Sequence, residues 1–147
     1  SIGLQIEGAI EIVKSLYQIS TLQTLCLSNN RIENEGAVEI AKMLHKNSSI
    51  NTLRLRDCGI REEGISEIIT ALYQNTTLKI LDLTDNPIKI EQFATITEML
   101  SHNYTLTGLY LRCTSSAADL IIRVRELTAR NKKIQEEKRF RRQKVAA

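Results

Sequence analysis

A 28-residue period runs through the chain and constrains its fold more than any other feature. The period is carried by leucines that recur in two parallel series: Leu25, Leu53, Leu81 and Leu109, then Leu27, Leu55, Leu83 and Leu111. Each unit closes with a further series: Leu16, Leu44, Leu72 and Leu100. Agreement of many independent positions on one period indicates a repeat array rather than a single closed core.

The two halves of each unit have different periodicities. In the first half Leu25 and Leu27 alternate with small or polar residues, which predicts a short strand. The second half has apolar residues at the i, i+3, i+4, i+7 spacing of an amphipathic helix, as at Ala37, Ile40, Ala41 and Leu44. One strand and one helix per unit predict parallel strands, with all the helices on the opposite face of a solenoid.

Glycine recurs beside the start of the predicted helices, at Gly36 and Gly64. Glycine allows the backbone to approach its neighbour closely. We therefore expect tight contact between successive units at these positions.

The strand half also contains a recognisable motif. Its string LxxLxLxxNxI is present as Leu22-Leu25-Leu27-Asn30-Ile32 and again as Leu78-Leu81-Leu83-Asn86-Ile88, and it resembles the leucine-rich repeat. The 28-residue unit with a full helix is similar to the ribonuclease-inhibitor-like class, which includes ribonuclease inhibitors, NOD-like receptors, the Ran GTPase-activating protein and tropomodulins. The resemblance implies an α/β horseshoe with parallel strands on its concave face, helices on its convex face and an extended C-terminal helix.

In that class the position after LxLxx holds Asn or Cys, as it does here at Asn30, Cys58 and Asn86. We expect the two asparagine amides to turn inward and to bond loop backbone groups that would otherwise lack partners. Cys58 in the same position predicts a small buried side chain with an inert thiol.

The ends of the chain differ from the repeats between them. Residues 1–19 match only the helical half of a unit, with Ile12 in the phase of Ile40, so we expect upstream repeats or an upstream domain to be missing. The last unit has Thr114 and Ser116 in place of Asn and Ile, as degraded terminal repeats do. We assign residues 1–130 to the array, with units starting near 22, 50, 78 and 106, and residues 131–147 to a basic helical extension.

Charge is divided unevenly along the chain. Residues 123–147 hold 10 Lys or Arg against 3 Glu, whereas the rest of the chain holds 10 against 14 Asp or Glu. The cations that define this basic tail are Arg130, Lys132, Lys133, Arg139, Arg141 and Arg142. Nucleic acid or an acidic surface could bind only through the tail. We favour a solvated capping helix, and a coiled coil starting from Leu120, Val124, Leu127 and Asn131 is the alternative.

The chain has few residues arranged for chemistry. His45 and His102 have no triad-like or ligand-like context, and the sequence has no Gly-rich phosphate loop. We therefore predict no enzymatic activity, no cofactor, no metal and no small-molecule substrate. No apolar run is long enough to span a membrane.

Cysteine usage bears on the compartment. The chain has three cysteines, and an odd number without paired spacing favours a cytoplasmic protein. The sequons at Asn47, Asn75 and Asn103 lie 28 residues apart, so the turn of the repeat accounts for them.

The candidate binding surface is the concave face. It should display the strand residues that alternate with leucine, of which we select Cys26, Ser28, Arg54, Arg56, Asp82, Thr84, Tyr110 and Arg112. Arg and Tyr are frequent interface anchors, although Arg54 and Asp82 could instead pair with each other.

We predict a monomeric, non-enzymatic protein–protein interaction module whose partner is a protein of unknown identity. Tropomodulin-like actin-filament or cytoskeletal binding is the first alternative. A GTPase-activating role and a microbial effector role are the others.

Overall fold

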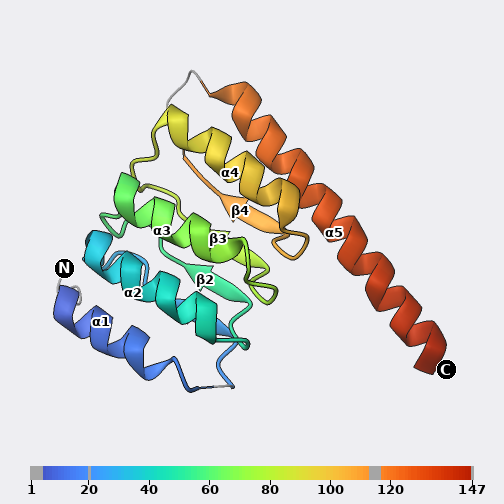
Figure 1. Ribbon diagram of the computed structural model, residues 1–147, viewed down its shortest axis with the longest axis horizontal. Helices are drawn as coiled ribbons and strands as arrows, with labels where there is room; N and C mark the ends of the chain where they lie inside the picture. The colour runs from blue at the N-terminus through green and yellow to red at the C-terminus, as the bar shows by residue number, and fades with distance from the viewer. Residues whose placement is uncertain (1–4, 20, 113–116, 147) are drawn as a thin grey trace.

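The computed structural model describes residues 5–19, 21–112 and 117–146. Within them helices and strands alternate strictly along the chain (Figure 1). The helices are α1 (Ile6–Ser15), α2 (Glu33–Lys46), α3 (Glu62–Leu72), α4 (Ile90–His102) and α5 (Ala118–Ala146). The strands are β1 (Thr24–Cys26), β2 (Thr52–Arg54), β3 (Ile80–Asp82) and β4 (Gly108–Tyr110). Thr114 and Ser116, on which the degraded last unit was argued, lie outside the described residues.

The strands form one parallel sheet in the order β1-β2-β3-β4. Leu25, Leu53, Leu81 and Leu109 are paired in register, so the 28-residue sequence period is also the period of the sheet. The helices lie side by side in a second layer over the strands (Figure 1). This confirms the α/β solenoid with an extended C-terminal helix.

The hydrophobic core is the seam between these two layers. The inward leucines of the strands and the helical stripe, such as Leu53, Ile40 and Ile68, are fully buried. Ile12 is an exception: it has the phase of Ile40 but is 37% exposed, whereas Ala9 and Val13 of the same helix are buried. No strand precedes α1 in the described residues, so the Ile12 side chain lacks the sheet against which Ile40 packs.

Gly64 lies at a close approach between two units. A Cβ at this position would stand 2.8 Å from the Cβ of Ala37 in α2, which is closer than side chains pack. Beside it, Asn34 of α2 accepts hydrogen bonds from the backbone N–H groups of Arg61 (2.9 Å) and Gly64 (3.2 Å). The side chain of one helix thus caps the start of the next, because the missing Cβ allows the two to meet.

Buried amide side chains join the units at the strand ends. Asn86 donates from Nδ2 to the carbonyl of Leu55 in the preceding unit (2.7 Å) and to that of Leu83 (3.0 Å). Its Oδ1 accepts from the backbone N–H groups of Cys58 and Ile60, both at 3.1 Å. The amide therefore satisfies loop groups of two units at once.

A second set of buried asparagines lies where each helix turns back toward its strand. Asn47, Asn75 and Asn103 donate from Nδ2 to carbonyls 31 residues earlier, at 3.0, 2.8 and 2.7 Å. Each Oδ1 accepts from backbone N–H groups of its own turn, as Asn75 does from Thr77 and Leu78. These three asparagines are the ones in the sequons, and their hydrogen bonds show that the turn of the repeat uses them.

Helix α5 packs against α4 and β4 as far as its middle. Asn131 is fully buried and donates to the carbonyls of Asn103 (2.7 Å) and Leu106 (2.8 Å). One turn later, Gln135 donates to the carbonyl of Tyr104 (2.8 Å). Beyond this point α5 projects away from the other elements (Figure 1). A helix without packing is marginal in water, so the buried half anchors the exposed half.

Asn75 provides a test of the buried amides. We expect Asn75→Ala to lower the free energy of unfolding by about 1–3 kcal/mol, because it leaves buried backbone groups without partners. Thr76→Ala, at the exposed neighbouring position, is the control and should change it little. Chemical denaturation followed by circular dichroism measures both. Equal stability of the two variants would contradict the proposed role of the amide.

Candidate protein-binding surface

The sheet aligns the last residues of the four strands in one row. Cys26, Arg54, Asp82 and Tyr110 are paired in register across the four strands. Tyr110 is 55% exposed, and Cys26 and Arg54 are also exposed. The strand face thus presents a thiol, a guanidinium and a phenol to solvent.

Arg54 and Asp82 are adjacent in this row, but no ion pair joins them in the described part of the chain. The carboxylate of Asp82 instead accepts a hydrogen bond from the backbone N–H of Thr84 (2.9 Å). The Arg54 guanidinium therefore remains available to a partner.

Arg56 and Arg112 both bind a residue that the sequence analysis missed, Asp85. Arg56 Nε and Nη2 each lie 2.9 Å from Asp85 Oδ2, and Arg112 Nη1 lies 2.9 Å from Oδ1. Asp85 has a left-handed backbone conformation, with φ 61°, at the last position of the third LxLxx string, directly before Asn86. The 28-residue period aligns both arginines with Thr84, the residue directly before Asp85, and this near match could have revealed Asp85.

Hydrogen bonds from the two arginines lower the pKa of the Asp85 carboxyl. The Arg112 guanidinium, with a second contribution from Arg56, holds the pKa of the Asp85 carboxyl below its usual range. Asp85 thus stays ionised and fixes both arginines, each of which remains largely exposed. The result is a preorganised pair of guanidinium groups at the edge of the strand face.

Ser28 and Thr84 are engaged in holding their loops. Ser28 Oγ accepts from the backbone N–H of Arg56 in the next unit (3.1 Å). The carbonyl of Thr84 accepts from the backbone N–H of Asp57 (3.0 Å). Ser28 therefore helps to position Arg56, whereas the backbone of Thr84 joins its loop to that of Asp57.

The three motif positions lie at the ends of the first three strands. Asn30 is partly buried and donates to the carbonyls of Leu27 (2.9 Å) and Ser28 (3.2 Å). Cys58 is buried, its Sγ lies 3.2 Å from the carbonyl of Leu27, and burial raises the pKa of its thiol to about 11. At neutral pH this thiol is protonated. It donates a hydrogen bond to the backbone carbonyl, as the Asn86 side-chain amide does at the same position of the next unit.

The basic tail divides into two groups. Arg130 differs from the expectation: it donates from Nη2 to the carbonyls of Leu100 (2.7 Å) and Asn103 (3.2 Å) and stacks 4.5 Å over the ring of Tyr104. It therefore fastens α5 to α4 and is not a free tail cation. The remaining tail cations are exposed: Lys132, Lys133, Arg139, Arg141 and Arg142.

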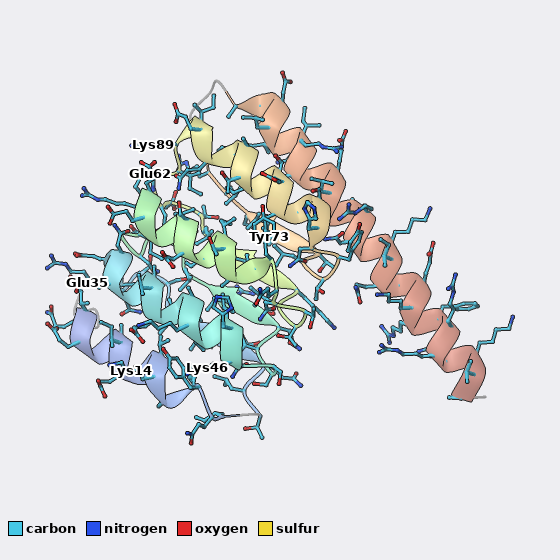
Figure 2. All side chains as sticks on the ribbon, viewed as in Figure 1. Lys14, Glu35, Lys46, Glu62, Tyr73 and Lys89 are labelled. Atoms are coloured by element: carbon cyan, nitrogen blue, oxygen red, sulfur yellow. The ribbon has the colours of Figure 1, made fainter. Side chains whose placement is uncertain are left out.

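The loops before α2 and α3 enclose an open hollow of about 810 Å³. Its lining mixes Arg31 and Arg61 with Glu33, Asp57 and Glu63. Arg31 pairs with Glu33, and next to the hollow Lys89 pairs with Glu62 at 2.6 Å (Figure 2). These exposed ion pairs contribute little to stability, and the hollow is typical of a solvated loop surface.

The side chains of residues 5–19, 21–112 and 117–146 form no cluster typical of a metal site. No group of three or more His, Cys, Asp or Glu side chains there could hold a metal ion. His102 contacts the Ser101 hydroxyl and the ring of Tyr73, without a carboxylate partner. No helix among the described residues is long and apolar enough to cross a membrane.

Comparison with known proteins agrees with this geometry. The sequence matches the leucine-rich repeat family over residues 18–41, 46–68 and 74–89. No curated protein sequence matches it. The family match and the observed α/β solenoid support a leucine-rich-repeat fold similar to that of the ribonuclease-inhibitor-like class.

Among solved structures, the chain is similar to actin-binding site 2 of leiomodin-1, with a TM-score of 0.90 and 27% sequence identity. The match covers 98% of this chain and 83% of that one. The C-terminal domain of tropomodulin from Caenorhabditis elegans is similar at a TM-score of 0.59 and 12% identity, over 93% and 99% of the two chains. The tropomodulin likeness shows a shared fold.

The Asp85 cluster predicts a specific titration. We expect Arg112→Gln to raise the pKa of the Asp85 carboxyl toward its usual range, because it removes the main hydrogen-bond donor. Arg54→Gln, which leaves both donors in place, should not change it. NMR titration of the labelled carboxyl carbon measures the shift.

The same cluster fixes the sign of a pH effect. A lowered carboxyl pKa stabilises the fold above the usual range of Asp, about 4, and that contribution is lost as the pH falls through the lowered value. An Asp85 pKa in the usual range in the unmodified chain would contradict the cluster.

Proposed function

We propose that this leucine-rich-repeat module binds actin through its concave strand face, without enzymatic activity and in the cytoplasm. The observation that carries the proposal is the likeness to actin-binding site 2 of leiomodin-1 over 98% of the chain. That likeness extends from the repeats into α5, so it involves more than the repeat consensus.

The chemistry of the strand face supports this proposal. Arg54, Arg56 and Arg112 supply guanidinium groups, and Tyr110 supplies an exposed aromatic ring in the same row as Arg54. Arginine and tyrosine contribute strongly to interfaces because each combines a large contact area with hydrogen-bonding groups. Two of the three arginines are already held by Asp85, so their ordering costs little entropy on binding.

The exposed half of α5 offers a second, weaker contact. Its lysines and arginines lie on a helix that projects beyond the array, and they would attract an acidic part of the partner. We assign this electrostatic role to the extension and the specific contacts to the strand face.

Charge reversal tests the assignment. We expect the double variant Arg54→Glu, Arg56→Glu to weaken actin binding at least about tenfold, equivalent to roughly 1.4 kcal/mol. Cosedimentation of the purified chain with filamentous actin measures the dissociation constant, and circular dichroism verifies that the variant is folded.

The matched control is Lys14→Glu, Lys46→Glu, which makes the same change in charge on helices α1 and α2 (Figure 2). It should bind nearly as well as the unmodified chain. Absence of binding by the folded unmodified chain would refute the actin assignment. Equal weakening by the two double variants would refute the strand face as the contact surface.

A further inference from the structure

The junction between β4 and α5 leaves a small apolar pocket open to solvent. Leu111 is only partly buried, whereas Leu55 and Leu83 at the same phase of the inner units are fully buried. Among the described residues no further strand lies beyond β4 to cover Leu111. The pocket has a volume of about 140 Å³.

The floor and the rim of the pocket differ in chemistry. The floor is formed by four aliphatic side chains, two from the last strand segment and two from α5: Leu109, Leu111, Ile121 and Val124. The rim is formed by Thr84, Tyr110 and Arg125. None of these described lining residues carries a carboxylate.

Tyr110 and Arg125 give the rim its polarity. The Tyr110 ring lies over Gly108, where a Cβ would stand 3.3 Å from its Cε2 atom. Arg125 is exposed and has no ion-pair partner among the described residues, and Arg112 directly follows the floor residue Leu111. The Arg125 guanidinium beside an aliphatic floor is complementary to an apolar side chain next to an acidic one.

The size of the pocket defines what can enter it. An apolar cavity of about 150 Å³ holds a molecule the size of benzene, so this pocket accommodates one side chain. It is too small for an ordinary small-molecule ligand, which needs roughly 300 Å³ or more. Pockets that bury a single anchor side chain often dominate the energy of a protein interface.

We propose that this pocket receives one apolar side chain of actin, and that Arg125 pairs with a carboxylate next to that side chain. This inference rests on the proposed actin binding and extends the contact surface from the strands onto α5. Tyr110 belongs to both parts, so the strand face and the pocket form one continuous surface.

Adjacent residues of α5 provide matched variants. Ile121→Gln and Arg125→Glu alter the pocket, whereas Ile122→Gln and Arg123→Glu make the same changes at exposed positions outside its lining. We expect each pocket variant to weaken binding to filamentous actin at least about tenfold and each control by less than about twofold, measured by cosedimentation.

The outcomes separate the two proposals. If the unmodified chain does not bind actin, the proposed function fails and this inference fails with it. If the unmodified chain binds and the folded pocket variants bind equally well, only the pocket is refuted. Because Ile121 packs partly against the core, a thermal melt accompanies each variant. If Ile121→Gln unfolds the chain, the exposed Arg125→Glu variant decides the question.

Discussion

The buried asparagine amide is the interaction on which the rest of this structure depends. A solenoid turns its backbone twice per unit inside a close-packed interior, and each turn leaves N–H and C=O groups that water cannot reach. Asn86 satisfies them at the strand end, and Asn47, Asn75 and Asn103 satisfy them at the helix end. Because each amide bonds the preceding unit as well as its own, the same contacts that satisfy the turns also set the spacing of the strands.

The regular spacing of the strands places the variable residues of each unit side by side on one surface. With the leucines and asparagines committed to the interior, the strand residues between them are left to face solvent in fixed register. Arg56, Asp85 and Arg112 come from three points far apart in the chain, yet the repeat brings them to 2.9 Å contacts. A rigid scaffold that presents ordered guanidinium groups and an exposed tyrosine suits protein binding better than chemistry, which would need convergent acid, base or nucleophilic groups.

The period was enough to predict the alternation of helices and strands, the parallel sheet, the helical layer and the row containing Arg54, Asp82 and Tyr110. It did not predict features that depend on neighbours outside the consensus. Ile12 has the correct phase for burial but is 37% exposed. Arg130 has the charge and position of a tail cation, yet it bonds the Leu100 carbonyl and stacks on the ring of Tyr104. The contacts of Asp85 arise between units, and the pocket beside Ile121 depends on how α5 packs against the last strand, so the pattern within one repeat indicates neither.

The proposed function makes the strand face and the start of α5 one contact surface, and hydroxyl-radical footprinting read by mass spectrometry tests it most directly. Tyr110 is exposed on the strand face, and Tyr73 is exposed on the helical layer (Figure 2), so each reports on one side of the molecule. We predict that saturating filamentous actin slows oxidation of Tyr110 and leaves that of Tyr73 unchanged. Protection of Tyr73, with Tyr110 oxidised as fast as in the free chain, would contradict the account.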